Sequence, residues 1–181
     1  MEPADNAIPQ TPLDPVTEGL FNFAIDREDV TWLVAGLPAE VAADRNTLEY
    51  ELQLVKIIFV GWSILYSMEE GSLRQELAER YWQAVHELAA NVSHTTGLMI
   101  GREVDYFAAV RERLAHYLDA LQRNNGADPA GVVGREFAYC CGVPDDLFTA
   151  MAGSRLFVAT LSRIREYLAA VAAENPGAPS N

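Results

Sequence analysis

The chain has 181 residues, of which 50% are hydrophobic and 22% are charged, and its formal net charge is −13 at pH 7. This length and composition suit one globular domain that can bury enough apolar surface to fold without metals or disulfides. The negative charge disfavours binding to nucleic acids and to anionic membranes, because both carry phosphate groups that would repel the chain.

The beginning of the chain is its most acidic part. Residues 1–51 carry eleven acidic and two basic side chains, whereas residues 52–181 carry fifteen and eleven. Residues 1–19 also contain four prolines and no apolar periodicity, so we predict a flexible, acidic, proline-rich arm there. No basic start followed by an apolar run marks a signal peptide, and the two cysteines are adjacent, so we expect a reducing, cytoplasmic setting.

The segments that follow all have helical patterns. Asp26 can cap a short helix that carries Val30 and Leu33, and the capping-box spacing of Asn46 and Glu49 predicts the start of a long helix. The helices predicted after the Asp26 helix span about 46–70, 72–94 and 103–124, then a short one over 128–141 and a last one over 144–174, and a flexible tail follows over 175–181. No long segment alternates with a period of two, so the predicted fold class is all-α, with five to seven helices in one domain over 20–174.

The stretch "IIFVGWSILYSM", residues 57–68, is the most apolar part of the chain. Twelve helical residues span about 18 Å, which is too short for about 30 Å of bilayer hydrocarbon, and charged residues flank the stretch on both sides. On a helical projection of residues 46–70, the polar side chains fall in one sector about 80° wide. Such a helix is predicted to be central. Either the rest of the chain encloses it, or one apolar side packs on a partner subunit.

Residue types that carry catalysis or bind metals are few. None of the three histidines has a glutamate three positions before it, as a di-iron bundle requires, and two cysteines are too few for a closed zinc site. If helices 72–94 and 103–124 form a hairpin, His86 lies level with Glu112, but His86 and His116 both point away from the predicted core faces. Cys140 shares a face with Phe137 and is predicted to be a buried structural thiol. We therefore assign no catalytic residue, no metal and no cofactor.

A few residues are candidates for ligand binding or for an interface. Lys56 lies in the polar sector of the central helix, and Trp62 and Tyr66 could line a pocket beside that helix. Arg155 interrupts an apolar run and could clamp a carboxylate, whereas Gly153 and Ser154 next to it indicate close contact between helices. The candidate residues for an interface with a partner subunit are Ile58, Trp62 and Leu65.

Three functional hypotheses remain. The favoured one is an acidic helical interaction or assembly protein that forms a homodimer, because the helices carry more apolar surface than one small bundle easily hides. The second is a small-molecule binding or sensor domain with a pocket between helices. The third is an enzyme whose site is not visible from one sequence. A nucleic-acid or membrane partner is not expected.

Overall fold

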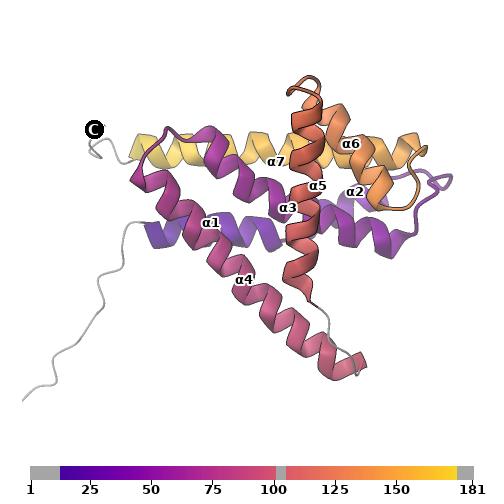
Figure 1. Cartoon of the computed structure of the whole chain (residues 1–181), viewed down its shortest axis with the longest axis horizontal. Helices are drawn as coiled ribbons and strands as arrows, with labels where there is room; N and C mark the ends of the chain where they lie inside the picture. The colour runs from indigo at the N-terminus through magenta and orange to yellow at the C-terminus, as the bar shows by residue number, and fades with distance from the viewer. Residues whose placement is uncertain (1–12, 101–104, 175–181) are drawn as a thin grey trace, which may run out of the picture.

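A long central helix organises the fold, which is seen in a computed structural model that describes residues 13–100 and 105–174 (Figure 1). The described residues form seven helices and no strand, which confirms the predicted all-α class and helix number. The helices are α1 (Leu13–Ile25), α2 (Glu28–Ala35), α3 (Arg45–Ser67), α4 (Ser72–Ile100), α5 (Tyr106–Arg123), α6 (Pro129–Cys140) and α7 (Leu147–Glu174). Helix α4 extends beyond the rest of the bundle at its C-terminal end (Figure 1).

Helix α3 is enclosed by the other helices of the same chain. Residues 51–61 are all buried, and α3 packs against α1, α2, α4, α5 and α7. Phe59 is at the centre of this packing, with ring centroids 4.6 Å from Phe157 of α7 and 5.6 Å from Tyr117 of α5. Of the two alternatives for the central helix, burial within one chain therefore applies to this stretch, because neighbouring helices cover its whole circumference.

Helix α1 corrects the prediction that residues 1–19 form a flexible arm. Residues 13–19 belong to α1, and Leu20 and Ala24 on the same helix are fully buried. The misjudged signal is Pro15, which lies in the first turn of α1. A helix leaves its first four N–H groups unpaired, so proline loses nothing there. Residues 1–12 of the predicted arm and the predicted tail 175–181 lie outside the described residues.

The ends of α3 also differ from the prediction. Asp44, rather than Asn46, caps the helix, because its carboxylate accepts a hydrogen bond of 3.0 Å from the backbone N–H of Thr47. The helix ends at Ser67 instead of near Glu70, and Met68 has an extended backbone with φ −104° and ψ 146°. Helix α4 begins at Ser72, as expected, but continues to Ile100 instead of ending near His94.

Small residues allow two pairs of helices to approach closely. A Cβ atom added to Gly153 of α7 would lie 2.6 Å from the Cβ of Phe137 on α6, and Ser154 donates a 2.8 Å hydrogen bond to the carbonyl of Ala130. The close helix contact that Gly153 and Ser154 predicted is thereby confirmed. Gly61 plays the same part on α3, where the indole ring of Trp82 from α4 occupies the space of a side chain.

Candidate functional site

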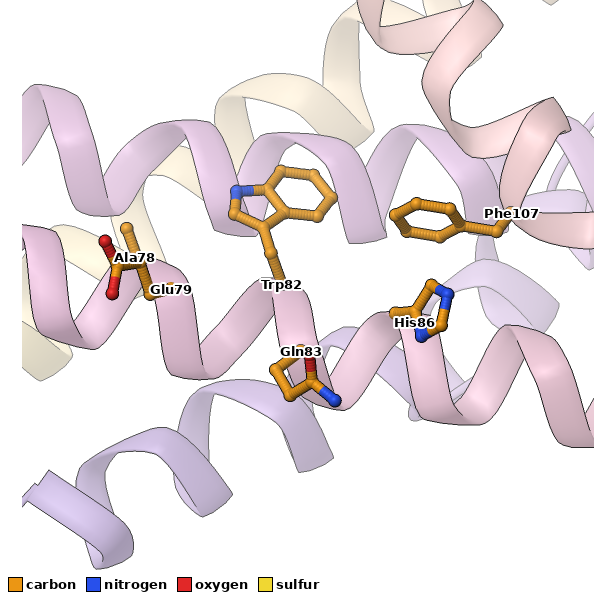
Figure 2. A pocket seen from close by; sticks show the side chains of 6 residues that line it. All are labelled: Ala78, Glu79, Trp82, Gln83, His86 and Phe107. Atoms are coloured by element: carbon orange, nitrogen blue, oxygen red, sulfur yellow. The ribbon is translucent and has the colours of Figure 1, made fainter.

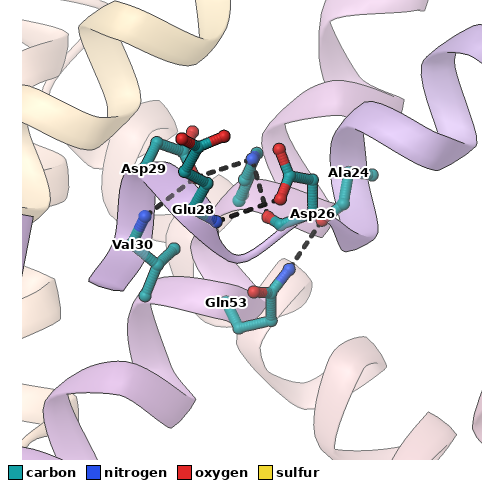
Figure 3. Close-up of polar contacts among 7 residues, drawn as sticks. Ala24, Asp26, Glu28, Asp29, Val30 and Gln53 are labelled. Atoms are coloured by element: carbon teal, nitrogen blue, oxygen red, sulfur yellow. Dashed lines mark hydrogen bonds and ion pairs between the residues drawn. The ribbon is translucent and has the colours of Figure 1, made fainter. Parts of the chain in front are cut away.

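The polar sector of α3 faces the junction between α1 and α2, where Gln53 lies near Ala24 (Figure 3). Lys56 of the same sector is fully buried. Its ammonium group donates hydrogen bonds of 2.8 Å to the carbonyl of Asp26 and 2.7 Å to the carboxylate of Asp29. The ammonium also lies 4.3 Å from the ring centroid of Phe23. Gln53 donates a 2.6 Å hydrogen bond to the carbonyl of Ala24.

These contacts have a structural role. The last carbonyls of a helix lack intrahelical partners, and a cation near them interacts favourably with the helix dipole. Lys56 and Gln53 supply such partners at the end of α1. Lys56 has no exposed surface and its ammonium group makes two hydrogen bonds within the chain, so these contacts do not support its prediction as a ligand-binding residue.

A second buried polar group, an ion pair, joins α3 to α5. Arg113 contacts Glu51 through two parallel hydrogen bonds of 2.8 and 2.7 Å. The Glu51 side chain is 4% exposed and the Arg113 side chain 30%. The hydrogen bonds to Glu51 raise the pKa of Arg113, which stays charged. This pair satisfies a carboxylate that would otherwise be buried without a counterion.

Two thiols lie near this ion pair, at the end of α6. Burial raises the pKa of Cys141 to about 12, and the nearby negative charge of Glu51 adds to the effect. Burial also raises the pKa of Cys140, although Arg113 opposes the change. A thiolate is the reactive form of cysteine, so both residues are poor nucleophiles at neutral pH. Cys141 is buried, whereas Cys140 is only partly buried. The predicted buried structural thiol therefore describes Cys141 better than Cys140.

The histidines do not form the arrangement considered from the sequence. His86 packs edge-on against Phe107, with ring centroids 4.8 Å apart. His116 instead faces α6, where its Nε2 lies 2.7 Å from a carboxylate oxygen of Glu136. Its ring stacks on Tyr139 with centroids 5.7 Å apart. No group of three or more histidine, cysteine or acidic side chains converges as a metal site in the part of the chain that the structure describes.

A groove of about 480 Å³ runs between α4 and α5 (Figure 2). Its lining side chains are Ala78, Glu79, Trp82, Gln83, His86 and Phe107. The groove is open to solvent and contains none of the residues predicted to bind a ligand. Its aromatic walls and one carboxylate at the edge could hold a small aromatic molecule, but no nucleophile or activated acid–base pair lies within this lining.

The other predicted residues lie apart. Trp62 and Tyr66 stack on each other with ring centroids 4.7 Å apart near the end of α3, and Arg155 is exposed on α7. Lys56 and Trp62 are separated by about 120° around α3, so they face different neighbours. Ligand contact by Trp62, Tyr66 or Arg155 individually stays a prediction.

The predicted interface residues also divide. Ile58 is fully buried within the single chain, so it has no surface to offer a partner, and its assignment to an interface is wrong. Trp62 is partly buried and Leu65 is 44% exposed. With Tyr66 and Leu73, which are 66% and 46% exposed, Leu65 forms an apolar patch at the turn between α3 and α4, called here the turn patch.

A second apolar surface lies on the first half of α7 and was missed from the sequence. Leu147 is 68% exposed, Met151 49% and Val158 51%, and Phe148 beside them is 42% exposed. We call Leu147, Met151 and Val158 the α7 stripe. The signal was available as apolar residues at spacings of four and seven. The opposite face of α7 is apolar as well, so the pattern alone did not reveal which side would be covered.

No described helix has both the length and the apolarity needed to cross a bilayer. No family model, curated protein or solved structure matches the chain. The function therefore has to be inferred from the chemistry of the site and surface.

Proposed function

We propose that this chain is a helical interaction protein that assembles into a homodimer. The observation that supports the proposal most strongly is the exposed α7 stripe. Large apolar side chains are exposed singly on most proteins, but a contiguous group indicates a surface that another protein covers. A second copy of the chain is the commonest partner of such a surface, because a two-fold pair buries the same patch twice.

The ionisable groups of the interior support this class of function over catalysis. Lys56, Glu51 and Arg113 are all held by partners within the chain, and the buried thiols favour their protonated form. An active site needs groups that can exchange protons or bind substrate, and these groups are occupied with fold-stabilising contacts.

Light scattering of the full chain at micromolar concentration tests the proposal. We expect a mass of twice the 19.9 kDa of one chain. We expect Met151→Glu to shift the population to monomers, because it places two charges in an apolar contact. A parent protein that stays monomeric up to 100 μM, a concentration chosen as roughly the ceiling for a weak specific dimer, would rule the homodimer out.

A second candidate function is the binding of a small aromatic cation in the groove between α4 and α5. Trp82 and Phe107 line the groove with aromatic rings, Arg111 already lies 5.6 Å from the Phe107 ring centroid, and Glu79 supplies a negative charge. Calorimetric titration with aromatic amines tests it. Heat that saturates with the parent chain, and is lost with Phe107→Ala, would favour this candidate. Equal heats for the two proteins would count against it.

A further inference from the structure

The α7 stripe has a shape that suits pairing with another helix. At about 100° per residue, Leu147, Met151 and Val158 fall within about 40° of one another. They span eleven helix positions, or about 17 Å along the axis. Arg165 continues the same line beyond the apolar part. The stripe is therefore a straight, narrow ridge with a basic residue at one end.

Charges are arranged unequally at the two ends of this ridge. Asp145 and Asp146 come immediately before Leu147, whereas Arg163 and Arg165 follow the stripe. Asp145, Arg163 and Arg165 are exposed, and Asp146 is partly buried because its carboxylate caps α7 by accepting hydrogen bonds from Thr149. Residues 145–165 carry two acidic and three basic side chains, although the whole chain has a net charge of −13. Two copies can thus meet here without the repulsion that the rest of the surface imposes.

We propose that two copies pair through α7 in an antiparallel arrangement, with the two-fold axis between Ser154 and Arg155. The inference rests on the proposed homodimer and names the surface and orientation that form it. In this register Met151 of each copy lies level with Val158 of the other, so this apolar contact is made twice. The same register brings Asp145 of one copy near Arg165 of the other, which lies on the line of the stripe, whereas a parallel pair would place like charges together.

The turn patch is a poorer surface for self-pairing. Residues 65–80 carry four acidic and two basic side chains. Both basic residues, Arg74 and Arg80, already pair with Glu70 and Glu76 of the same helical region, at 3.5 and 2.7 Å. A two-fold contact there would bring acidic rims together with no free basic residue to compensate.

Cysteine cross-linking of the full chain tests the register. The double variant Met151→Cys, Val158→Cys should form disulfide-linked dimers under mild oxidation, because residues 151 and 158 of opposite copies face each other. Met151→Cys alone should not, since its own counterpart lies about 10 Å away along the axis. The parent chain controls for the native thiols. A dimer by light scattering with no 151–158 cross-link would overturn this inference and leave the homodimer standing, whereas a monomer would overturn both.

The charges give an independent test, because Arg155 lies beside the proposed axis and its two copies approach each other there. Neutralising it with Arg155→Gln should therefore strengthen the dimer, by roughly threefold in Kd. Asp145→Arg should weaken the dimer by about fivefold, and adding Arg165→Asp should restore it. Sedimentation equilibrium measures all three. No change in Kd with Arg155→Gln, together with no rescue by the exchanged pair, would refute the antiparallel arrangement.

Discussion

The middle of α3 and the outer face of α7 both depart from the usual distribution of apolar residues inside and polar residues outside. In α3, the polar side chains of Glu51, Gln53 and Lys56 are buried. In α7, the stripe of Leu147, Met151 and Val158 is exposed. Both departures cost free energy unless something compensates for them. In α3 the compensation comes from hydrogen bonds and ion pairs within the chain, whereas the α7 stripe is left exposed by residues 13–100 and 105–174.

This difference distinguishes unusual residues that stabilise the fold from unusual residues that could contact a partner. A buried charge draws attention as a candidate site, yet Lys56 and Glu51 each have partners that belong to the fold. The exposed stripe carries no reactive group, but it supports the proposed interaction because the described part of the chain leaves it uncovered. If this contrast is right, changes in α3 or at its partners should alter stability, and changes on the stripe should alter association.

The largest expected effect is on the ion pair between Glu51 and Arg113. Arg113→Ala should lower the free energy of unfolding by about 3 kcal/mol, because it leaves a buried carboxylate without a counterion. Glu51→Gln should cost only about 1 kcal/mol, since the exposed part of Arg113 can still contact water. Urea denaturation measures both. Equal losses for the two variants would show that the carboxylate is better hydrated than its burial implies. The contrast between α3 and the α7 stripe would then fail.

The contact between α3 and α4 should be the next most sensitive. A Cβ atom at Gly61 would lie 2.4 Å from the indole of Trp82 and 2.9 Å from the ring of Tyr81. Gly61→Ala should therefore destabilise the fold by about 2 kcal/mol despite the higher helix propensity of alanine. Gly71→Ala is the matched control, because nothing lies within 4 Å of its added methyl group. Equal melting temperatures for the two variants would contradict this packing.

High pH should lower the free energy of unfolding through the buried thiol of Cys141. The pKa of Cys141 is raised from 9.0 to about 12, so the folded chain keeps a proton that the unfolded chain loses. This stabilisation is fully present below pH 9 and is lost as the pH rises from 9 to about 12, with a loss of about 1 kcal/mol by pH 10. Buried Tyr81 and Tyr117, whose pKa values burial raises well above 10.0, act in the same direction at higher pH. Urea denaturation at pH 8 and pH 10 should show a smaller loss for Cys141→Ser than for the parent.

The smallest expected effect is that of a substitution in the α7 stripe on the free energy of unfolding. Met151→Glu should change the free energy of unfolding of the monomer by less than about 0.5 kcal/mol, because about half of the side chain is already in water. Denaturation at a concentration below the dimer Kd measures the monomer alone. A loss of several kcal/mol would show that the residue belongs to the core, and the contrast with α3 would then fail.

The fold could be predicted in outline because its main signals are local. Residues 57–68 are apolar around the whole helix, which indicated a central position, and the run 51–61 is indeed buried. Close packing at Gly153 and Ser154 was also predicted correctly. Helix α1 was missed because four prolines in residues 1–19 outweighed the weak apolar pattern that surrounds Pro15.

The site could not be predicted to the same extent, because its determinants are distant in sequence. Glu51 and Arg113 are separated by 62 positions, and nothing near either residue indicates the other. The partners of Lys56 come from the junction that follows α1, a helix that was itself missed. The α7 stripe depends on which of two apolar faces the body covers, and only the packing of α6 and α3 against α7 decides that.

The burial of Lys56 has a further consequence, because it is the only lysine in the 181 residues. The folded chain offers no lysine ε-amine to acylating reagents or to enzymes that modify lysine. A protease specific for lysine has a single peptide bond to cut, after residue 56 in the middle of α3, and can reach it only when the core opens. The rate at which fragments 1–56 and 57–181 appear would therefore report how often the domain opens, without any added label.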